Sequence, residues 1–141
     1  MISNHFRYEA LLEIYQKQED LLIEEISALD REKKAVRQRI QHLSGKWQEA
    51  HEMLAKGKNG YDVGATLQYL EGLLGWIQAS KNQQALLDTT IIEKRRVVQE
   101  LRTERKRFGK LKERHLVECQ SLVRTLEQKV TDEFAQRKKN L

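Results

Sequence analysis

His115 and Cys119 are the residues of this chain whose side chains could most directly hold a metal ion. They stand four positions apart, so they share one face of a helix, and imidazole and thiolate are both zinc ligands. A closed zinc site needs about four ligands, however, and no second pair lies nearby. Cys119 is the single cysteine, and the other histidines are scattered: His5, His42 and His51. We therefore predict no metal site and expect both side chains to fill a helix–helix seam.

Catalytic chemistry is not indicated anywhere along the chain. The glycine-rich stretch GKNGYDVG, residues 57–64, lacks the Gly-Lys-Ser/Thr ending of a phosphate-binding loop, and no strand precedes it. Carboxylates on an exposed helix are solvated charges, and a pair of helices offers no deep pocket to bury a nucleophile or an acid–base pair. We predict that the protein is not an enzyme and that it uses no cofactor.

The basic stretch 94–114 could in principle bind nucleic acid, because Lys and Arg supply most of the affinity for phosphates. Acidic residues interleave this stretch, and no series of aromatic residues accompanies it. The order of a basic zipper, with a bare basic region before the heptads, is also absent. We therefore expect no nucleic-acid partner, and we assign part of this charge to an acidic protein partner.

Composition predicts long helices rather than a compact globular domain. Charged residues make up 33% of the 141 residues, the hydrophobic class makes up 39%, and proline is absent. Proline-free sequences rich in Glu, Lys, Arg, Gln and Leu are typical of coiled coils. No secretory signal and no membrane span is expected, and a single cysteine fits a reducing compartment. These features predict a cytoplasmic protein.

Apolar residues recur at alternating steps of four and three in two long runs, which is the spacing of a coiled-coil seam. The first run continues upstream through Leu11 and Tyr15 after an expected phase slip near Gln18. Its members are Leu22, Ile26, Leu29, Lys33, Val36, Ile40, Leu43, Trp47, Ala50 and Leu54. The second run consists of Leu87, Ile91, Lys94, Val98, Leu101, Arg105, Phe108, Lys112, His115, Cys119, Leu122 and Leu126.

Glycines, Asn59 and Asp62 mark a single break between the two runs, because these residues suit a turn and a helix N-cap. We predict one coiled-coil domain over residues 1–141, with a helix at 4–56, a turn at 57–61 and a helix at 62–138. The fold class is all-α, a long antiparallel two-helix hairpin.

Charge favours this hairpin over a parallel dimer. Residues 1–30 carry seven acids against two bases, whereas residues 93–114 carry ten bases against four acids. A turn near residue 60 makes facing residue numbers add to about 121, which sets the acidic stretch opposite the basic one. Surface ion pairs contribute only about 0.2–1 kcal/mol each, but a run of them penalises other registers. In this register the C-terminal end of the second helix projects beyond the first helix.

The segment LQYLEGLLGWI, residues 67–77, carries more apolar surface than one seam needs. We expect one stripe to face the partner helix: Leu67, Leu70, Leu74 and Ile77. A second stripe of Tyr69, Leu73 and Trp76, about 100° away, would form an exposed patch that binds another protein. The alternative is a locally thicker core in which Trp76 folds against Trp47 or the turn.

Four segments together resemble the flagellar FliJ family of type III export stalk proteins, which is related to the YscO-type secretion stalks. The opening FRYEALLEIYQKQED pairs an aromatic with a basic residue before a Leu-, Glu- and Gln-rich helix. After the turn, LQYLEGLLGWI is similar to the family's aromatic-x-x-x-Leu segment. The basic pattern VVQELRTERKRFGKLKERH and the ending EQKVTDEFAQRKK also resemble the family. The likeness covers essentially the whole chain.

The resemblance implies a coiled-coil stalk that promotes assembly and activity of a hexameric export ATPase and contacts the export gate and substrate chaperones. It implies localisation in the cytoplasm at the inner-membrane export apparatus. The family's gate-contacting positions fall on Tyr69, Leu73 and Trp76. The implied ATPase-facing candidates are Arg105, Arg107, Phe108, Lys112, Asp132, Glu133 and Phe134. The alternatives are the stalk of a virulence secretion system and a homodimeric coiled-coil scaffold or chaperone.

Overall fold

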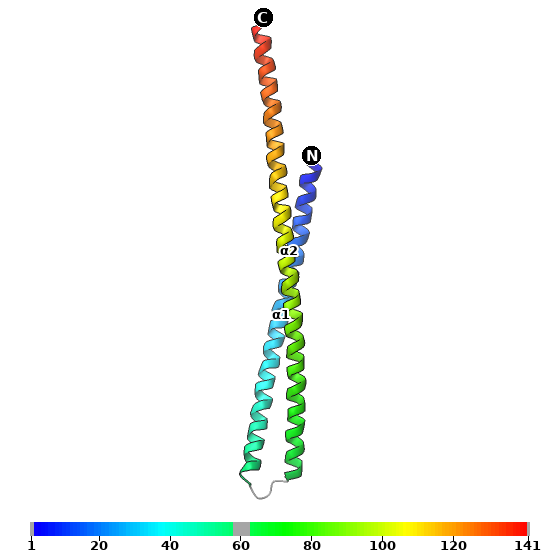
Figure 1. Ribbon diagram of the computed structural model, residues 1–141, viewed down its shortest axis with the longest axis vertical. Coiled ribbons are helices and arrows are strands. Elements are labelled where there is room, and N and C mark those ends of the chain that lie inside the picture. The colour runs from blue at the N-terminus through cyan, green and yellow to red at the C-terminus, as the bar shows by residue number, and fades with distance from the viewer. Residues whose placement is uncertain (1, 58–62, 141) are drawn as a thin grey trace. The chain divides into compact units, whose positions relative to one another are not determined.

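Two helices make up the computed structural model, which describes the backbone of residues 2–57 and 63–140 and their side chains from residue 7 onward. Helix α1 spans Ile2–Ala55 and helix α2 spans Val63–Lys139 (Figure 1). Within the described residues there is no strand. The helices begin and end within two residues of the expected limits. Most of the predicted turn, with Asn59 and Asp62, lies outside the described residues.

Local features stabilise the C-terminal end of each helix. Gly57 adopts a φ of 58°, the left-handed conformation that glycine reaches at little cost, and its N–H donates to the carbonyl oxygen of Leu54 at 3.3 Å. This turns the chain out of α1. The last turn of α2 carries Arg137, Lys138 and Lys139, whose positive charges are favourable beside the negative end of the helix dipole.

The chain forms two compact units, each containing one stretch of α1 and one of α2. We call Leu22–Val97 the turn unit, and Met1–Leu21 with Val98–Leu141 the terminal unit. In both units, residues that follow one another along α1 meet residues that run backwards along α2. This antiparallel pairing confirms the predicted helical hairpin.

The interhelical ion pairs confirm the predicted register. In the turn unit, Lys33 contacts Asp88 at 2.5 Å. In the terminal unit, Lys112 contacts Glu9 at 3.0 Å, and Arg102 contacts Glu19 at 2.8 Å. The residue numbers of each of these pairs add to 121, the value expected from the charge distribution.

The core of the turn unit is aliphatic. All ten seam positions predicted on α1, from Leu22 to Leu54, are buried or half-buried, with Val36 the most deeply buried. The α2 side contributes the buried side chains Leu70, Leu73, Ile77, Leu87 and Ile91. Such burial contributes about 25 cal/mol per Å² of apolar surface, so this seam supplies most of the unit's stability.

The predicted seam on the first turns of α2 was correct at Leu70 and Ile77 and wrong at Leu67 and Leu74. Leu67 and Leu74 are half exposed, while Leu73 is 6% exposed and lies in the seam. The second run, extended backwards from Leu87 in its own rhythm, passes through Gln84, Ser80, Ile77, Leu73, Leu70 and Thr66. The polar residues in that extension obscured it, although Ser80 and Thr66 are buried in the structure.

The seam of the terminal unit mixes polar, aromatic and aliphatic side chains, among them the buried Val98 of α2. On α1 the seam positions at steps of four and three are Tyr8, Leu12, Tyr15 and Glu19, and the predicted stripe residue Leu11 is half-buried as well. The expected phase slip near Gln18 is therefore wrong, because the carboxylate of Glu19 occupies the seam position where an apolar residue was sought. Beyond the paired part, residues 121–140 of α2 are exposed throughout, so the projecting helix end is as predicted.

Candidate protein-binding surfaces

A groove lies between α1 and α2 in the turn unit, next to the predicted aromatic patch. It has a volume of about 260 Å³, and it is lined by Leu43, Lys46, Tyr69, Gly72, Leu73 and Trp76. A second shallow hollow shares Leu43 and Trp76 and extends the surface past Arg39, Ala79, Ser80 and Gln83. The two hollows together form one elongated surface with an apolar floor, which we call the turn groove.

The three predicted patch residues play different parts in the turn groove. Tyr69 and Trp76 are 49% and 69% exposed and stand two helical turns apart, so they form one wall. Leu73 belongs to the buried cluster with Leu43 and Ile77, which corrects the expectation that it lies on the exposed stripe. Its side chain forms part of the floor between the two aromatic residues.

Trp47, not Trp76, is the tryptophan that thickens the core. It packs against the cluster of Leu43, Leu73 and Ile77 and stacks on the His51 ring at a centroid distance of 4.8 Å. The indole N–H of Trp47 is buried without an acceptor in the described residues. The alternative in which Trp76 folds against Trp47 is wrong, because the Trp76 side chain lies mostly in solvent.

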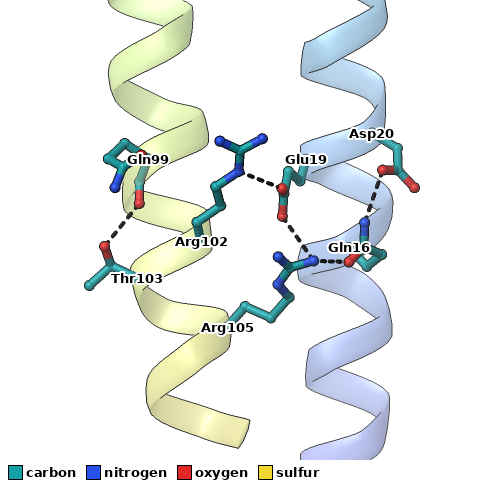
Figure 2. A network of polar contacts seen from close by, with 7 residues as sticks. All are labelled: Gln16, Glu19, Asp20, Gln99, Arg102, Thr103 and Arg105. Atoms are coloured by element: carbon teal, nitrogen blue, oxygen red, sulfur yellow. Dashed lines mark hydrogen bonds and ion pairs between the residues drawn. The ribbon is translucent and has the colours of Figure 1, made fainter.

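Three of the predicted ATPase-facing residues make contacts with α1 inside the terminal unit: Arg105, Phe108 and Lys112. Figure 2 shows Glu19 between two guanidinium groups, with Arg102 Nε at 2.8 Å and Arg105 Nη1 at 3.3 Å from its carboxylate oxygens. Arg105 also donates to Gln16. Glu19 is only 3% exposed, and a buried carboxylate is tolerable because both of its oxygens face a cation. Arg105 therefore points toward α1.

Phe108 also faces α1. Its ring stacks on Tyr15 at a centroid distance of 5.7 Å and lies 6.4 Å from the Tyr8 ring. Lys112 pairs with Glu9, as described above, whereas Arg107 is mostly exposed, with Glu104 of its own helix 4.0 Å away. Of these basic and aromatic candidates, Arg107 is the one that presents its side chain outward.

The projecting end of α2 carries the remaining predicted residues. Asp132 accepts a hydrogen bond from Gln128 at 3.3 Å, Glu133 is exposed, and Phe134 is 67% exposed. Phe134 continues a stripe of exposed apolar residues at steps of four and three, which we call the projecting stripe. It consists of Val123, Leu126, Val130 and Phe134. Sequence reasoning missed Val123 and Val130, although continuing the heptad four residues past Cys119 leads to Val123.

No feature of the described residues points to metal chemistry or membrane insertion. Cys119 Sγ lies 3.7 Å from His115 Nε2, but no group of three potential metal ligands gathers in the described part of the chain. Neither helix, over the residues described, contains a stretch long and apolar enough to cross a membrane.

Comparison with known proteins identifies the family. No curated protein and no solved structure matches the chain. The model of the family described as Flagellar FliJ protein matches residues 4–140, which is nearly the whole chain. The chain therefore belongs to the FliJ family of flagellar type III export stalk proteins.

Proposed function

We propose that this chain is an adaptor stalk that binds the flagellar export ATPase, promotes assembly and activity of its hexamer, and also contacts the export gate and substrate-specific chaperones. The observation that carries the proposal is the family match over residues 4–140. In this role the protein associates with the membrane-bound apparatus through other proteins and needs no catalytic site, metal or cofactor of its own.

The terminal unit is the proposed ATPase-binding part. The projecting stripe is exposed along its length, and apolar residues at helical spacing are the usual anchors of a helix that docks into a groove. Arg107, Asp132 and Glu133 supply outward charges beside or within this region. Arg105, Phe108 and Lys112 support binding indirectly, because they hold α1 against α2.

Hydrolysis and hexamer formation by the export ATPase test this assignment directly. Adding the full chain is expected to raise both, and no change in either would contradict the proposal. Leu126→Asp should abolish most of the stimulation, because it places a carboxylate in the middle of the projecting stripe. Thr125→Asp is the matched control: it adds the same charge one position away, outside the stripe, and should keep the stimulation.

The turn groove is the proposed gate-binding surface. Tyr69 and Trp76 offer exposed aromatic area, and Leu73 gives the groove an apolar floor, a combination that is typical of binding hot spots. Gly72 lies on the groove lining, and a Cβ built there meets no atom within 4 Å. The first carbon of a larger side chain therefore has open space at this position, and we expect such a side chain to fill the groove.

Gly72→Leu is expected to weaken binding of the full chain to the cytoplasmic domain of the export gate by at least tenfold. Gly75→Leu is the control, because Gly75 lies in the same helix with equally open space and does not line the groove. Equal binding by the two variants, measured by calorimetry, would show that the groove is not the gate-binding surface. Circular dichroism of both variants checks that the helices remain intact.

A further inference from the structure

The turn groove lies in a part of the chain where basic residues outnumber acidic ones. Residues 33–48 of α1 and 69–87 of α2 contain six basic residues and one acidic residue, Glu71. The six are Lys33, Lys34, Arg37, Arg39, Lys46 and Lys81. Elsewhere in the paired helices acids and bases alternate or face each other, so this segment differs from the rest of the chain.

The two cations that line the groove, Arg39 and Lys46, have no ion-pair partner among the described residues. Both side chains are exposed. The first acid after this segment of α2 is Asp88, and its carboxylate already contacts Lys33 at 2.5 Å. Like charges that lack internal partners raise the local positive potential, and this potential attracts an anionic ligand.

The spacing of the lining residues specifies the shape of a complementary ligand. Arg39 and Lys46 stand seven residues apart on α1, about 10 Å along the helix axis. Tyr69 and Trp76 stand seven residues apart on α2, with Leu43 and Leu73 between the two walls. One wall is thus cationic, the other is aromatic, and the floor is aliphatic over two helical turns.

We propose that the turn groove binds an acidic amphipathic helix of a partner protein. Apolar residues of that helix would lie on Leu43, Leu73 and Trp76, and carboxylates spaced about two turns apart would pair with Arg39 and Lys46. The inference rests on the proposed function only for the identity of the partner as the export gate. Its chemical content comes from the charges and spacing of the groove.

A pair of synthetic helical peptides tests the charge requirement on the full-length chain. The first carries leucines at positions i, i+4, i+7 and i+11 with flanking glutamates seven residues apart, and the second carries lysines in place of those glutamates. Fluorescence anisotropy of labelled peptides gives Kd at two salt concentrations. The glutamate peptide is expected to bind at least tenfold more tightly, with an advantage that shrinks as salt rises. Equal binding of the two peptides would overturn the proposal.

Charge reversal locates the binding to the groove. The double variant Arg39→Glu and Lys46→Glu should weaken the glutamate peptide about tenfold and improve binding of the lysine peptide. The control is Lys106→Glu with Lys110→Glu, which changes the net charge equally at exposed positions outside the groove. Equal losses in both double variants would show a net-charge effect and overturn the proposal.

A membrane surface is the competing anionic ligand. Sedimentation with phosphatidylserine vesicles separates the two, because a lipid surface needs no helical spacing of charges. Vesicle binding that depends on Arg39 and Lys46, together with no binding of the glutamate peptide, would overturn the proposal. The peptide experiment contains no export gate, so its outcome stands apart from the Gly72→Leu experiment: either result can fail while the other holds.

Discussion

The two units of this protein hold the same pair of helices together by different means. In the turn unit, most buried side chains are aliphatic, from Val36 on α1 to Ile91 on α2. Among the described residues of the terminal unit, the most deeply buried is Glu19, whose carboxylate contacts Arg102 and Arg105. Val98 is buried there too, and aromatic rings and ion pairs make further contacts.

This difference matches the surfaces that the units present. In the turn unit, close-packed aliphatic side chains lie beneath the groove between Trp76 and Lys46. In the terminal unit, the buried Glu19 carboxylate lies between two arginines, and the exposed end of α2 extends beyond the paired part.

Leu43→Ala should have the largest effect on stability. It removes a side chain from the cluster of Leu73, Ile77 and Trp47 and leaves a cavity, for which the expected loss is about 2–4 kcal/mol in the free energy of unfolding. Urea denaturation followed by circular dichroism measures the loss. Leu86→Ala is the control, because Leu86 is 70% exposed and should change stability by less than about 0.5 kcal/mol. Similar losses in both variants would mean that the aliphatic seam is not the main contribution to the free energy of unfolding.

Glu19→Ala should have the next largest effect, a loss of about 1–2 kcal/mol. The variant leaves Arg102 and Arg105 without their carboxylate, but both side chains are partly exposed and can turn toward water, which limits the cost. Glu13→Ala removes an exposed carboxylate from the same helix and should be nearly neutral. Glu19→Leu sharpens the test: if it is more stable than the unsubstituted chain, the polar seam costs stability compared with an aliphatic one.

Sequence reasoning predicted the fold well because the hairpin rests on two regular signals. The seam of α1 was correct at all ten positions from Leu22 to Leu54, since an unbroken helix keeps its hydrophobic stripe on one side. The register was correct because acidic and basic stretches occur once each and can face each other in one way. Both signals are long, so single exceptions such as Lys33 do not hide them.

The errors came where polar residues occupy seam positions. The sequence predicted a phase slip near Gln18 and not a seam position at Glu19. The burial of Glu19 depends on two arginines more than 80 residues away in the sequence. Because Ser80 and Gln84 interrupt the apolar stripe of α2, Leu74 was predicted to lie in the seam in place of Leu73. The exposed Tyr69 and Trp76 were found because the segment has more apolar residues than one seam can cover. The sequence did not predict which wall of the turn groove is cationic, because this depends on how the two helices pair.

Exchanging the charges of Lys33 and Asp88 should have a smaller effect. Each single reversal, Lys33→Asp or Asp88→Lys, sets like charges against each other and should lower stability by about 0.5–1 kcal/mol, while the double reversal restores most of it. The coupling is expected to be about 0.2–1 kcal/mol and to fall in high salt. No coupling in the double-mutant cycle would mean that this ion pair does not help to set the register of the turn unit.

The smallest effect is expected from Glu93, which pairs within α2 and takes no part in either seam. Hydrogen bonding to Arg96, with Nη2 at 2.5 Å, and the charge of that guanidinium lower the pKa of Glu93 below its ordinary 4.5. A carboxyl whose pKa is lowered on folding stabilises the folded state above its ordinary pKa. That contribution disappears as the pH falls through the lowered pKa.

Carbon-detected NMR titration of the Glu93 side chain should therefore give a midpoint below 4.5, and Arg96→Ala should return it toward that value. Because Glu93 is exposed, the accompanying change in unfolding midpoint should be smaller than for any seam variant, and salt should reduce it further. A loss of stability on Arg96→Ala comparable to that on Glu19→Ala would break the comparison. It would mean that an ion pair within one helix contributes as much to the free energy of unfolding as the polar seam between the two helices.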